Sequence, residues 1–255
     1  MKISLAQKNL FHEPARLLIS VGGVTFAIFL ILVLLALYRG WSESLSQYIY
    51  NVDADIWVMQ EGAIDMSHSI SLLPNPTQDQ LLTVTGVASV EGLVGNRVML
   101  DLPTGELTSR VMGFNTTTNS GGPADMIEGK AVPESGEIII DQIVRKNHGL
   151  DIGDTMTIKE TDFIIAGIAS GGPLFQQSYI TQDDARRLFQ LQDYTNFFVI
   201  SVNDNENIAA VMQRIEDTVP GVDAQTEEEF AINNEKEIMD KFLPIILILV
   251  VIGFM

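Results

Sequence analysis

The longest uncharged stretch of this chain is the run LLISVGGVTFAIFLILVLLALY, residues 17–38. As an α-helix, a run of this length rises about 33 Å, which exceeds the roughly 30 Å hydrocarbon core of a bilayer. A secretory signal peptide is the alternative, but its apolar core usually spans only about 7–15 residues before a cleavage site with small residues. This run is longer, and RGWSESL follows it without such a site. The stretch therefore predicts an uncleaved transmembrane helix.

The distribution of charge predicts how this helix is oriented. Lys2, Lys8 and Arg16 precede the helix against a single acid, Glu13. Residues 40–241 carry 32 acidic residues against 11 basic ones, a net charge of −21. Because positively charged flanks stay in the cytoplasm, we expect a cytoplasmic N-terminus and an extracytoplasmic acidic segment. So acidic a surface repels nucleic acid, which argues against a DNA- or RNA-binding role.

Small residues are spaced three and four apart within the predicted span. Ser20, Gly23 and Ala27 would form one stripe along the helix. Small side chains allow two membrane helices to approach closely. The stripe is therefore a candidate packing face of the transmembrane helix.

Helical segments flank the span and return to the membrane at the far end. Residues 1–16 are expected to lie as a weakly amphipathic segment on the cytoplasmic surface. Residues 39–52 predict a stalk helix, because four apolar residues repeat at helical spacing. These stalk-face residues are Trp41, Leu45, Tyr48 and Ile49.

A second stalk helix is predicted over residues 226–241. It begins with Thr226 and Glu229, which have the spacing of a capping box. The following run FLPIILILVVIGFM, residues 242–255, is expected to start a second transmembrane helix. Its rise of about 21 Å is too short to cross a bilayer, so we expect the sequence to be an N-terminal fragment.

Residues 53–225 predict an α+β domain of the split βαβ type. Two strand–helix–strand patterns, residues 53–94 and 197–226, frame it. Their helices are expected to bury Leu81, Leu82 and Val84 in the first unit, and Ile208, Val211, Met212 and Ile215 in the second. Between them, residues of about 96–190 predict an inserted β-rich subdomain of short strands with one helix that ends at Gly149.

No catalytic residue, cofactor site or metal site is expected. The chain has no cysteine, and His12, His68 and His148 are scattered. The glycine pairs at 121–122 and 171–172 lack the spacing and the lysine of a phosphate-binding loop. Asp53 and Asp55 would share one face of a strand, where a hydrated strand start is favoured over a cation site.

The segment at residues 129–172 resembles the periplasmic core domain of MacB/FtsX-type ABC transporter permeases. The resemblance is a glycine–proline lead, a GE strand, a helix ending in GL, a GD turn and a GI strand end. These features fall on Gly129, Pro133, Gly136, Glu137, Gly149, Leu150, Gly153, Asp154, Gly167 and Ile168. The opening KNLFHEPARLLIS resembles the family's N-terminal stretch, and VDADIWV, residues 52–58, resembles the DevC branch in particular. Together the similarity extends over essentially the whole chain.

This resemblance implies a permease subunit without an active site of its own. Such permeases have four spans, form dimers and work with an ABC ATPase, which would be the partner that hydrolyses ATP. Motion would pass through the stalks to the outer domain, often with a periplasmic adaptor and an outer-membrane channel as further partners. The cargo stays open, because a fold does not identify a substrate.

Other functions are compatible with the same layout. One alternative is a membrane-anchored extracytoplasmic sensor, which would continue into a cytoplasmic signalling module. Another is an FtsX-like regulator of cell-wall hydrolases, which moves no cargo. An anchored hydrolase is disfavoured because no nucleophile and base are apparent.

Overall fold

The computed structural model describes residues 14–66, 69–102, 105–170 and 176–254. The chain divides into two compact units, residues 43–235 and residues 1–42 together with 236–255. We call the first unit the folded domain and describe each unit separately.

The second unit contains the apolar parts of two long helices, α2 (Pro14–Asn51) and α7 (Glu227–Phe254). Among the described residues, one helical segment, Leu17–Gly40, is long and apolar enough to cross a membrane, with a mean hydropathy of 2.8 and no buried residues. The predicted transmembrane segment at residues 17–38 lies within it. Residues 1–13 of the predicted amphipathic segment lie outside the described residues. Helix α2 begins at Pro14, where the missing proline N–H costs no helical hydrogen bond.

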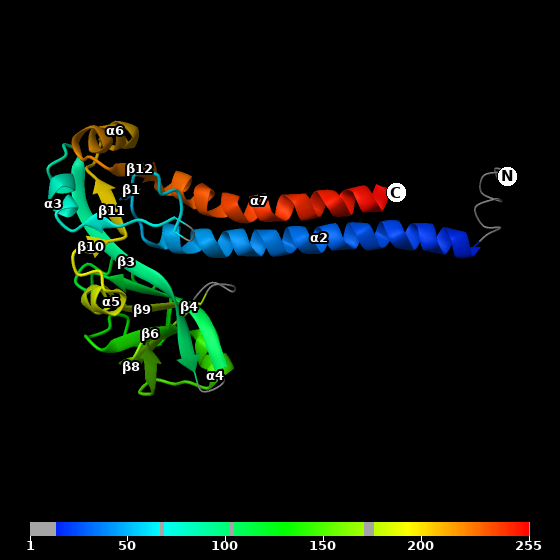
Figure 1. Ribbon diagram of the computed structural model, residues 1–255, viewed down its shortest axis with the longest axis horizontal. Coiled ribbons are helices and arrows are strands. Elements are labelled where there is room, and N and C mark those ends of the chain that lie inside the picture. Colours follow the sequence, from blue (N-terminus) through cyan, green and yellow to red (C-terminus); the bar gives the residue numbers. More distant parts are fainter. Residues whose placement is uncertain (1–13, 67–68, 103–104, 171–175, 255) are drawn as a thin grey trace. The chain divides into compact units, whose positions relative to one another are not determined.

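The folded domain is built on one continuous sheet (Figure 1). Among the described residues the sheet has ten strands in the order β12-β1-β11-β3-β4-β9-β6-β8-β5, and β7 pairs with β8. The strands are β1 (Ile56–Gln60), β3 (Val87–Leu102), β4 (Gly105–Phe114), β5 (Met126–Gly129), β6 (Glu137–Asp141), β7 (Thr155–Ile158), β8 (Thr161–Ala169), β9 (Gln177–Thr181), β11 (Phe197–Val202) and β12 (Val222–Thr226). A separate two-stranded sheet joins β2 (Leu73–Pro74) to β10 (Tyr194–Thr195).

The strands β12, β1, β11 and β3 form the predicted split βαβ sheet. Strand β11 lies between β1 and β3 and is antiparallel to both. Helices α3 (Thr77–Leu82) and α6 (Ile208–Thr218) cover one face of this sheet. Their buried residues Leu81, Val84, Val211 and Ile215 pack against strand residues such as Ile56 and Phe198. The fold-class prediction is therefore confirmed for the half of the folded domain that these four strands and two helices form.

Two predicted burials are wrong. Leu82 was expected in the core, but its side chain is 49% exposed. Helix α3 ends at this residue after only six residues, so a single face reaches the sheet and Leu81 occupies it. In the second strand–helix–strand pattern, Ile208 is also exposed, at 36%, and Met212 is half-buried.

The inserted β-rich subdomain, predicted at about residues 96–190 and called the insertion below, begins within a strand rather than after one. The sequence suggests a strand at 96–102 separate from the strand that follows α3, but the structure has one 16-residue strand, β3. Its first part, through Leu93, pairs with β11, and its second part, from Val94, pairs with β4. The two halves of the domain therefore share a strand, which the turn-like residues around Gly92 and Gly95 do not interrupt.

The insertion folds into a curled sheet around its own apolar core. Strand β7 approaches β3, so the sheet β3-β4-β9-β6-β8-β7 curves back on itself. Residues such as Val98, Met156 and Phe163 fill the interior. Helix α4 (Gln142–His148) ends at Gly149 in the left-handed conformation, as predicted. Helix α5 (Gln182–Phe189) was not predicted, although Thr181 caps it and Ala185, Leu188 and Phe189 form its buried face.

Candidate functional site

The ends of both long helices are packed into the core of the folded domain. Five residues are buried here: Tyr48 and Ile49 at the end of α2, Val52 just after it, and Phe230 and Ala231 near the start of α7. They share one apolar cluster with residues from both halves of the sheet, including Trp57 on β1, Phe197 on β11, Met112 on β4 and Tyr179 on β9. We call this cluster the junction core. Because it touches both helices and both halves of the domain, it is the candidate functional site.

Alternation along the strands creates the junction core. Successive side chains of a strand point to opposite faces, so Ile56 and Val58 face α3 and α6, whereas Trp57 and Met59 face the junction core. The whole of β1 except Gln60 is buried. The same strand therefore holds the helices of the βαβ unit on one face and the long helices on the other.

Three aromatic rings anchor the start of α7. Trp57 stacks on Phe230, with ring centroids 4.7 Å apart and 25° between the ring planes. Phe197 contacts both rings, at centroid distances of 6.0 Å from Trp57 and 5.6 Å from Phe230. Such pairs add about 0.5–1.5 kcal/mol to the burial of the rings themselves. The start of α7 is thereby fixed to β1 and β11, the two inner strands of the four-stranded βαβ part of the sheet.

Hydrogen bonds extend this anchor to a loop and to β4. The backbone N–H of Met66 donates to Asn234 Oδ1 at 2.9 Å, and Asn234 Nδ2 donates to the carbonyl oxygen of Phe230 at 2.7 Å. Arg110 Nη1 donates to the carbonyl oxygen of Met66 at 3.3 Å. Asn234 is buried, so the loss of its side chain would leave the Met66 N–H without a partner.

The two long helices contact each other through polar side chains at this level. Ser46 Oγ on α2 donates a hydrogen bond to Glu235 Oε1 on α7. Tyr48 OH donates to the carbonyl oxygen of Gly121 at 3.3 Å, which joins α2 to the loop after β4. Burial raises the pKa of Tyr48 above its ordinary value, so this phenol stays protonated and remains a donor.

The predicted capping box at the start of α7 is confirmed. The Glu229 N–H donates to Thr226 Oγ1 at 3.1 Å, and the Thr226 N–H donates to Glu229 Oε2 at 2.9 Å. Helix α7 therefore begins where β12 ends, with no intervening linker.

Only some of the predicted site residues lie in the junction core. Tyr48 and Ile49 lie in the junction core, whereas the side chains of Trp41 and Leu45 lie outside the described residues. In the candidate packing face, the Ser20 side chain is also outside the described residues, Gly23 is exposed and Ala27 is half-buried. The Ser20, Gly23 and Ala27 stripe stays a prediction.

Sequence reasoning missed the α7 side of the junction core. Phe230, Ala231 and Asn234 follow the acidic start of α7 at i, i+1 and i+4, which is a usable helical signal. It was overlooked because the acidic run suggested a hydrated helix face. The role of Met66 has no signal in the sequence, because its backbone makes the contact.

The acidic residues at the start of β1 and α7 carry no metal-binding arrangement. Within the described ranges, no three His, Cys, Asp or Glu residues are placed to hold a metal ion. Asp55 Oδ2 accepts a hydrogen bond from the Val202 N–H at 2.7 Å. Burial and the nearby Asp53 raise the pKa of Glu227. These carboxylates lie beside the start of α7.

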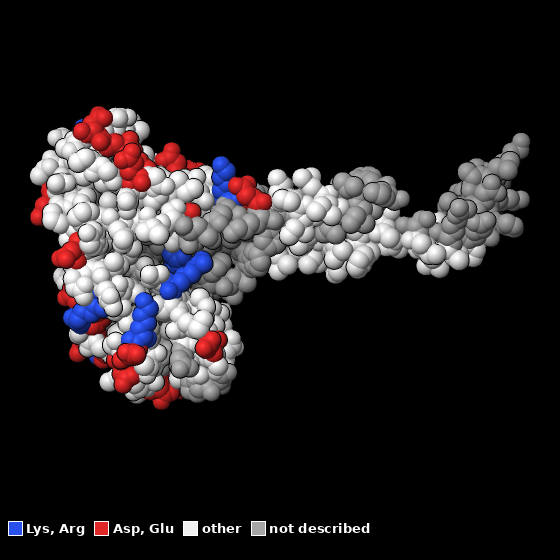
Figure 2. Space-filling view, in the orientation of Figure 1, with Lys and Arg blue, Asp and Glu red and all other residues white. Residues whose placement is uncertain are grey.

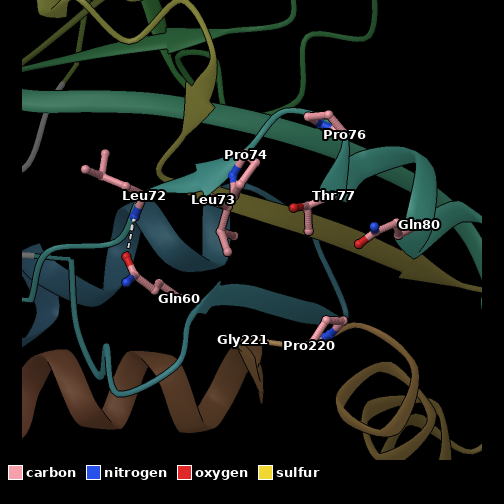
Figure 3. Close-up of a pocket in the computed structure, with 9 residues that line it drawn as sticks. All are labelled: Gln60, Leu72, Leu73, Pro74, Pro76, Thr77, Gln80, Pro220 and Gly221. Carbon is pink, nitrogen blue, oxygen red and sulfur yellow. Dashed lines mark hydrogen bonds between the residues drawn. The ribbon is translucent and has the colours of Figure 1, made fainter.

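A separate pocket of about 340 Å³ lies at the other end of β1 (Figure 3). The Leu72 N–H donates to Gln60 Oε1 across its rim at 3.1 Å. None of the described residues that line it has a titratable side chain. The lining residues are Gln60, Leu72, Leu73, Pro74, Pro76, Thr77, Gln80, Pro220 and Gly221. Its surface suits an uncharged, partly apolar group.

The folded domain is a mixed α/β domain with the ends of two long helices built into its core, and among the described residues one of these helices, α2, contains a segment long and apolar enough to cross a membrane. The sequence profile of the MacB-like periplasmic core domain matches residues 17–218. The chain therefore belongs to the MacB-like periplasmic core domain family, and the predicted resemblance to MacB/FtsX-type ABC permeases is confirmed. The DevC-like assignment stays a prediction.

Two solved structures have the same fold. The periplasmic region of MacB from Actinobacillus actinomycetemcomitans is 11% identical, with a TM-score of 0.52, and the match covers 69% of this chain and 90% of that one. The extracellular domain of the noncanonic ABC-type transporter YknZ from Gram-positive bacteria is 12% identical, with a TM-score of 0.52, covering 68% and 98% respectively. No curated protein matches the sequence.

Proposed function

We propose that this chain is a permease subunit of an ABC-type exporter in the bacterial inner membrane. Its N-terminus would be cytoplasmic and its folded domain extracytoplasmic, as the charge distribution favours. A partner ATPase would hydrolyse ATP, and the permease would act as a homodimer without catalysis of its own. A periplasmic adaptor and an outer-membrane channel are further expected partners.

The single observation that carries this proposal is the junction core. A domain joined to its membrane helices by flexible linkers could not transmit force, because linkers absorb displacement. In this chain Ile49, near the end of α2, and Phe230, near the start of α7, are both fully buried in the junction core. Any movement of either helix end must therefore move the sheet or break the aromatic stack.

The mechanism that follows is mechanical. ATP binding would change how the membrane helices sit, and α2 and α7 would carry that change to the two halves of the sheet through β1 and β4. The Ser46–Glu235 hydrogen bond joins the two helices at the level of the junction core. Relative sliding of α2 and α7 would therefore strain this hydrogen bond first.

The absence of cysteine from the sequence allows a direct test. The chain with its ATPase partner is placed in lipid nanodiscs, and Thr108→Cys, at an exposed position of β4, carries one spin label per subunit. We expect the distance between the two labels to change on addition of ATP and a non-hydrolysable analogue, but not of ADP. An unchanged distance would contradict mechanical transmission.

A cross-link provides the matched control. Ser46→Cys with Glu235→Cys places two thiols at hydrogen-bonded positions on α2 and α7, and each single variant serves as a control. Oxidation of the double variant should abolish the ATP-dependent distance change, and a reductant should restore it. A distance change with no cargo released under any condition would instead favour a regulator of the FtsX type.

A further inference from the structure

Three side chains from neighbouring strands gather on one face of the insertion sheet. Arg97 on β3 lies directly opposite Arg110 on β4, and Arg110 lies directly opposite Gln177 on β9. Residues paired across strands point to the same face, with Cβ atoms about 5 Å apart. This face is the one that contributes Met112 and Tyr179 to the junction core.

Two arginines opposite each other are unfavourable unless an anion lies near them. Burial and the neighbouring Arg97 lower the pKa of Arg110 to about 10, and Asp65 is the carboxylate that opposes this effect. Asp65 is thus one anion near this pair, and both arginines have further partners in the chain. Elsewhere the chain is strongly acidic, with a net charge of −18, and acidic side chains are spread over the visible face of the folded domain (Figure 2).

Gln177 supplies an independent observation. The residue is only 9% exposed, and its Nε2 has no hydrogen-bond partner among the residues that the structure describes. Buried amide groups normally have partners, because an unsatisfied one costs about 1–3 kcal/mol. Both arginines also interact with groups of the chain, such as Met66 for Arg110. A guanidinium carries five N–H donors, however, so each can serve a ligand as well.

We propose that Arg97, Arg110 and Gln177 form a binding site for a phosphate group. Arginine forks match both carboxylate and phosphate oxygens. Three donor side chains in a row on adjacent strands suit a group with three or more oxygens, which favours phosphate over carboxylate. The graded exposure, from exposed Arg97 through half-buried Arg110 to buried Gln177, gives the phosphate an entry from solvent.

The phosphate could belong to a free ion or to the headgroup of a lipid, and the experiment separates these sources. The full chain is purified in an uncharged maltoside detergent and titrated by calorimetry with inorganic phosphate and, separately, with dihexanoyl phosphatidic acid. Binding of both probes would show that the phosphate group suffices. Binding of the lipid alone would identify the headgroup as the source. Because the net charge of the chain repels anions in general, binding of neither would overturn the proposal.

Variants assign the binding to this face. Arg97→Gln should weaken binding by roughly tenfold or more, because it removes a charged hydrogen bond, whereas Arg97→Lys should retain part of the affinity. Arg214→Gln on α6 removes the same charge from a distant surface and should leave the affinity unchanged. Equal losses in Arg97→Gln and Arg214→Gln would mean that only net charge matters, and the site would be refuted. The test needs no ATPase or cargo, so it stands apart from the proposed export function.

Discussion

Trp57 on β1 and Phe230 on α7 form a stacked aromatic pair, although 173 positions separate them in the chain. Both rings are fully buried. The pair is thus the point at which the second long helix is fixed to the first strand of the sheet.

Truncation of Phe230 should therefore destabilise the folded domain. We expect Phe230→Ala to lower the free energy of unfolding by about 3–5 kcal/mol, because it leaves a cavity beside Trp57 and Phe197. Chemical denaturation followed by tryptophan fluorescence measures this. Ile232→Ala, two residues along and 52% exposed, should change the value by less than about 0.5 kcal/mol. Similar losses in both variants would show that the aromatic stack is not the anchor.

Asn234 should control the loop that contains Met66. Asn234→Ala removes the acceptor of the Met66 N–H and should cost about 1–3 kcal/mol, because a buried donor loses its partner. Hydrogen exchange at the Met66 amide should become faster. The Gln60 amide, which donates to Ser71 Oγ, is an internal control and should keep its exchange rate. An unchanged Met66 rate would contradict the predicted role of Asn234.

Asp184 should make stability depend on acid pH. Burial tends to raise the pKa of Asp184, but hydrogen bonds from the Gly136 N–H, Thr181, Arg187 and Ser135 outweigh burial and hold this pKa below its ordinary value. The stabilisation is therefore fully present at neutral pH and is lost as pH falls from about 4 through the lowered pKa. Asp184→Asn should unfold more easily at pH 7 and lose this part of the acid dependence. Melting temperatures from pH 2 to pH 7 measure it, and parallel curves for the two proteins would refute it.

The pH dependence that Glu227 gives to stability should have the opposite sign to that of Asp184. Burial and Asp53 raise its pKa, and its Oε1 is buried without a hydrogen-bond partner in the described part of the chain. Folding therefore favours the protonated form, so stability falls as pH rises from below the ordinary value, about 4.3, through the raised pKa. We expect Glu227→Gln to raise the melting temperature at pH 7 and to have little effect at pH 3. A lower melting temperature at pH 7 would show that the carboxylate is stabilising.

A break in α2 should uncouple the folded domain from the ATPase. Glu43→Gly together with Ser44→Pro interrupts the helix between the candidate span and Tyr48, because proline removes a helical hydrogen bond and clashes with the preceding turn. In the proposed exporter, ATP hydrolysis and membrane insertion should persist while export is lost. Gln47→Ala, at an exposed position of the same helix, should export normally. Export by the broken-helix variant at the normal rate would contradict the mechanical role of α2.

The sequence by itself determined the local elements of this protein. The uncharged run at residues 17–38 requires a long apolar helix, and the capping box at Thr226 and Glu229 fixes the start of α7. The period of two in β1 and the period of 3.6 in α6 are equally local, so they predicted a split βαβ frame. These features depend on residues only a few positions apart, which is why composition and spacing suffice.

Tertiary structure decided which of these elements pair and pack against one another. Trp57, Phe197 and Phe230 come together only when β1, β11 and α7 are assembled, and no local pattern relates them. The continuous strand β3 was missed because pairing with β11 and then with β4 holds it extended through Gly92 and Gly95. Arg97, Arg110 and Gln177 likewise share a face only through strand register. Long-range pairing and burial select such sets, because their energies arise between segments that are distant in the chain.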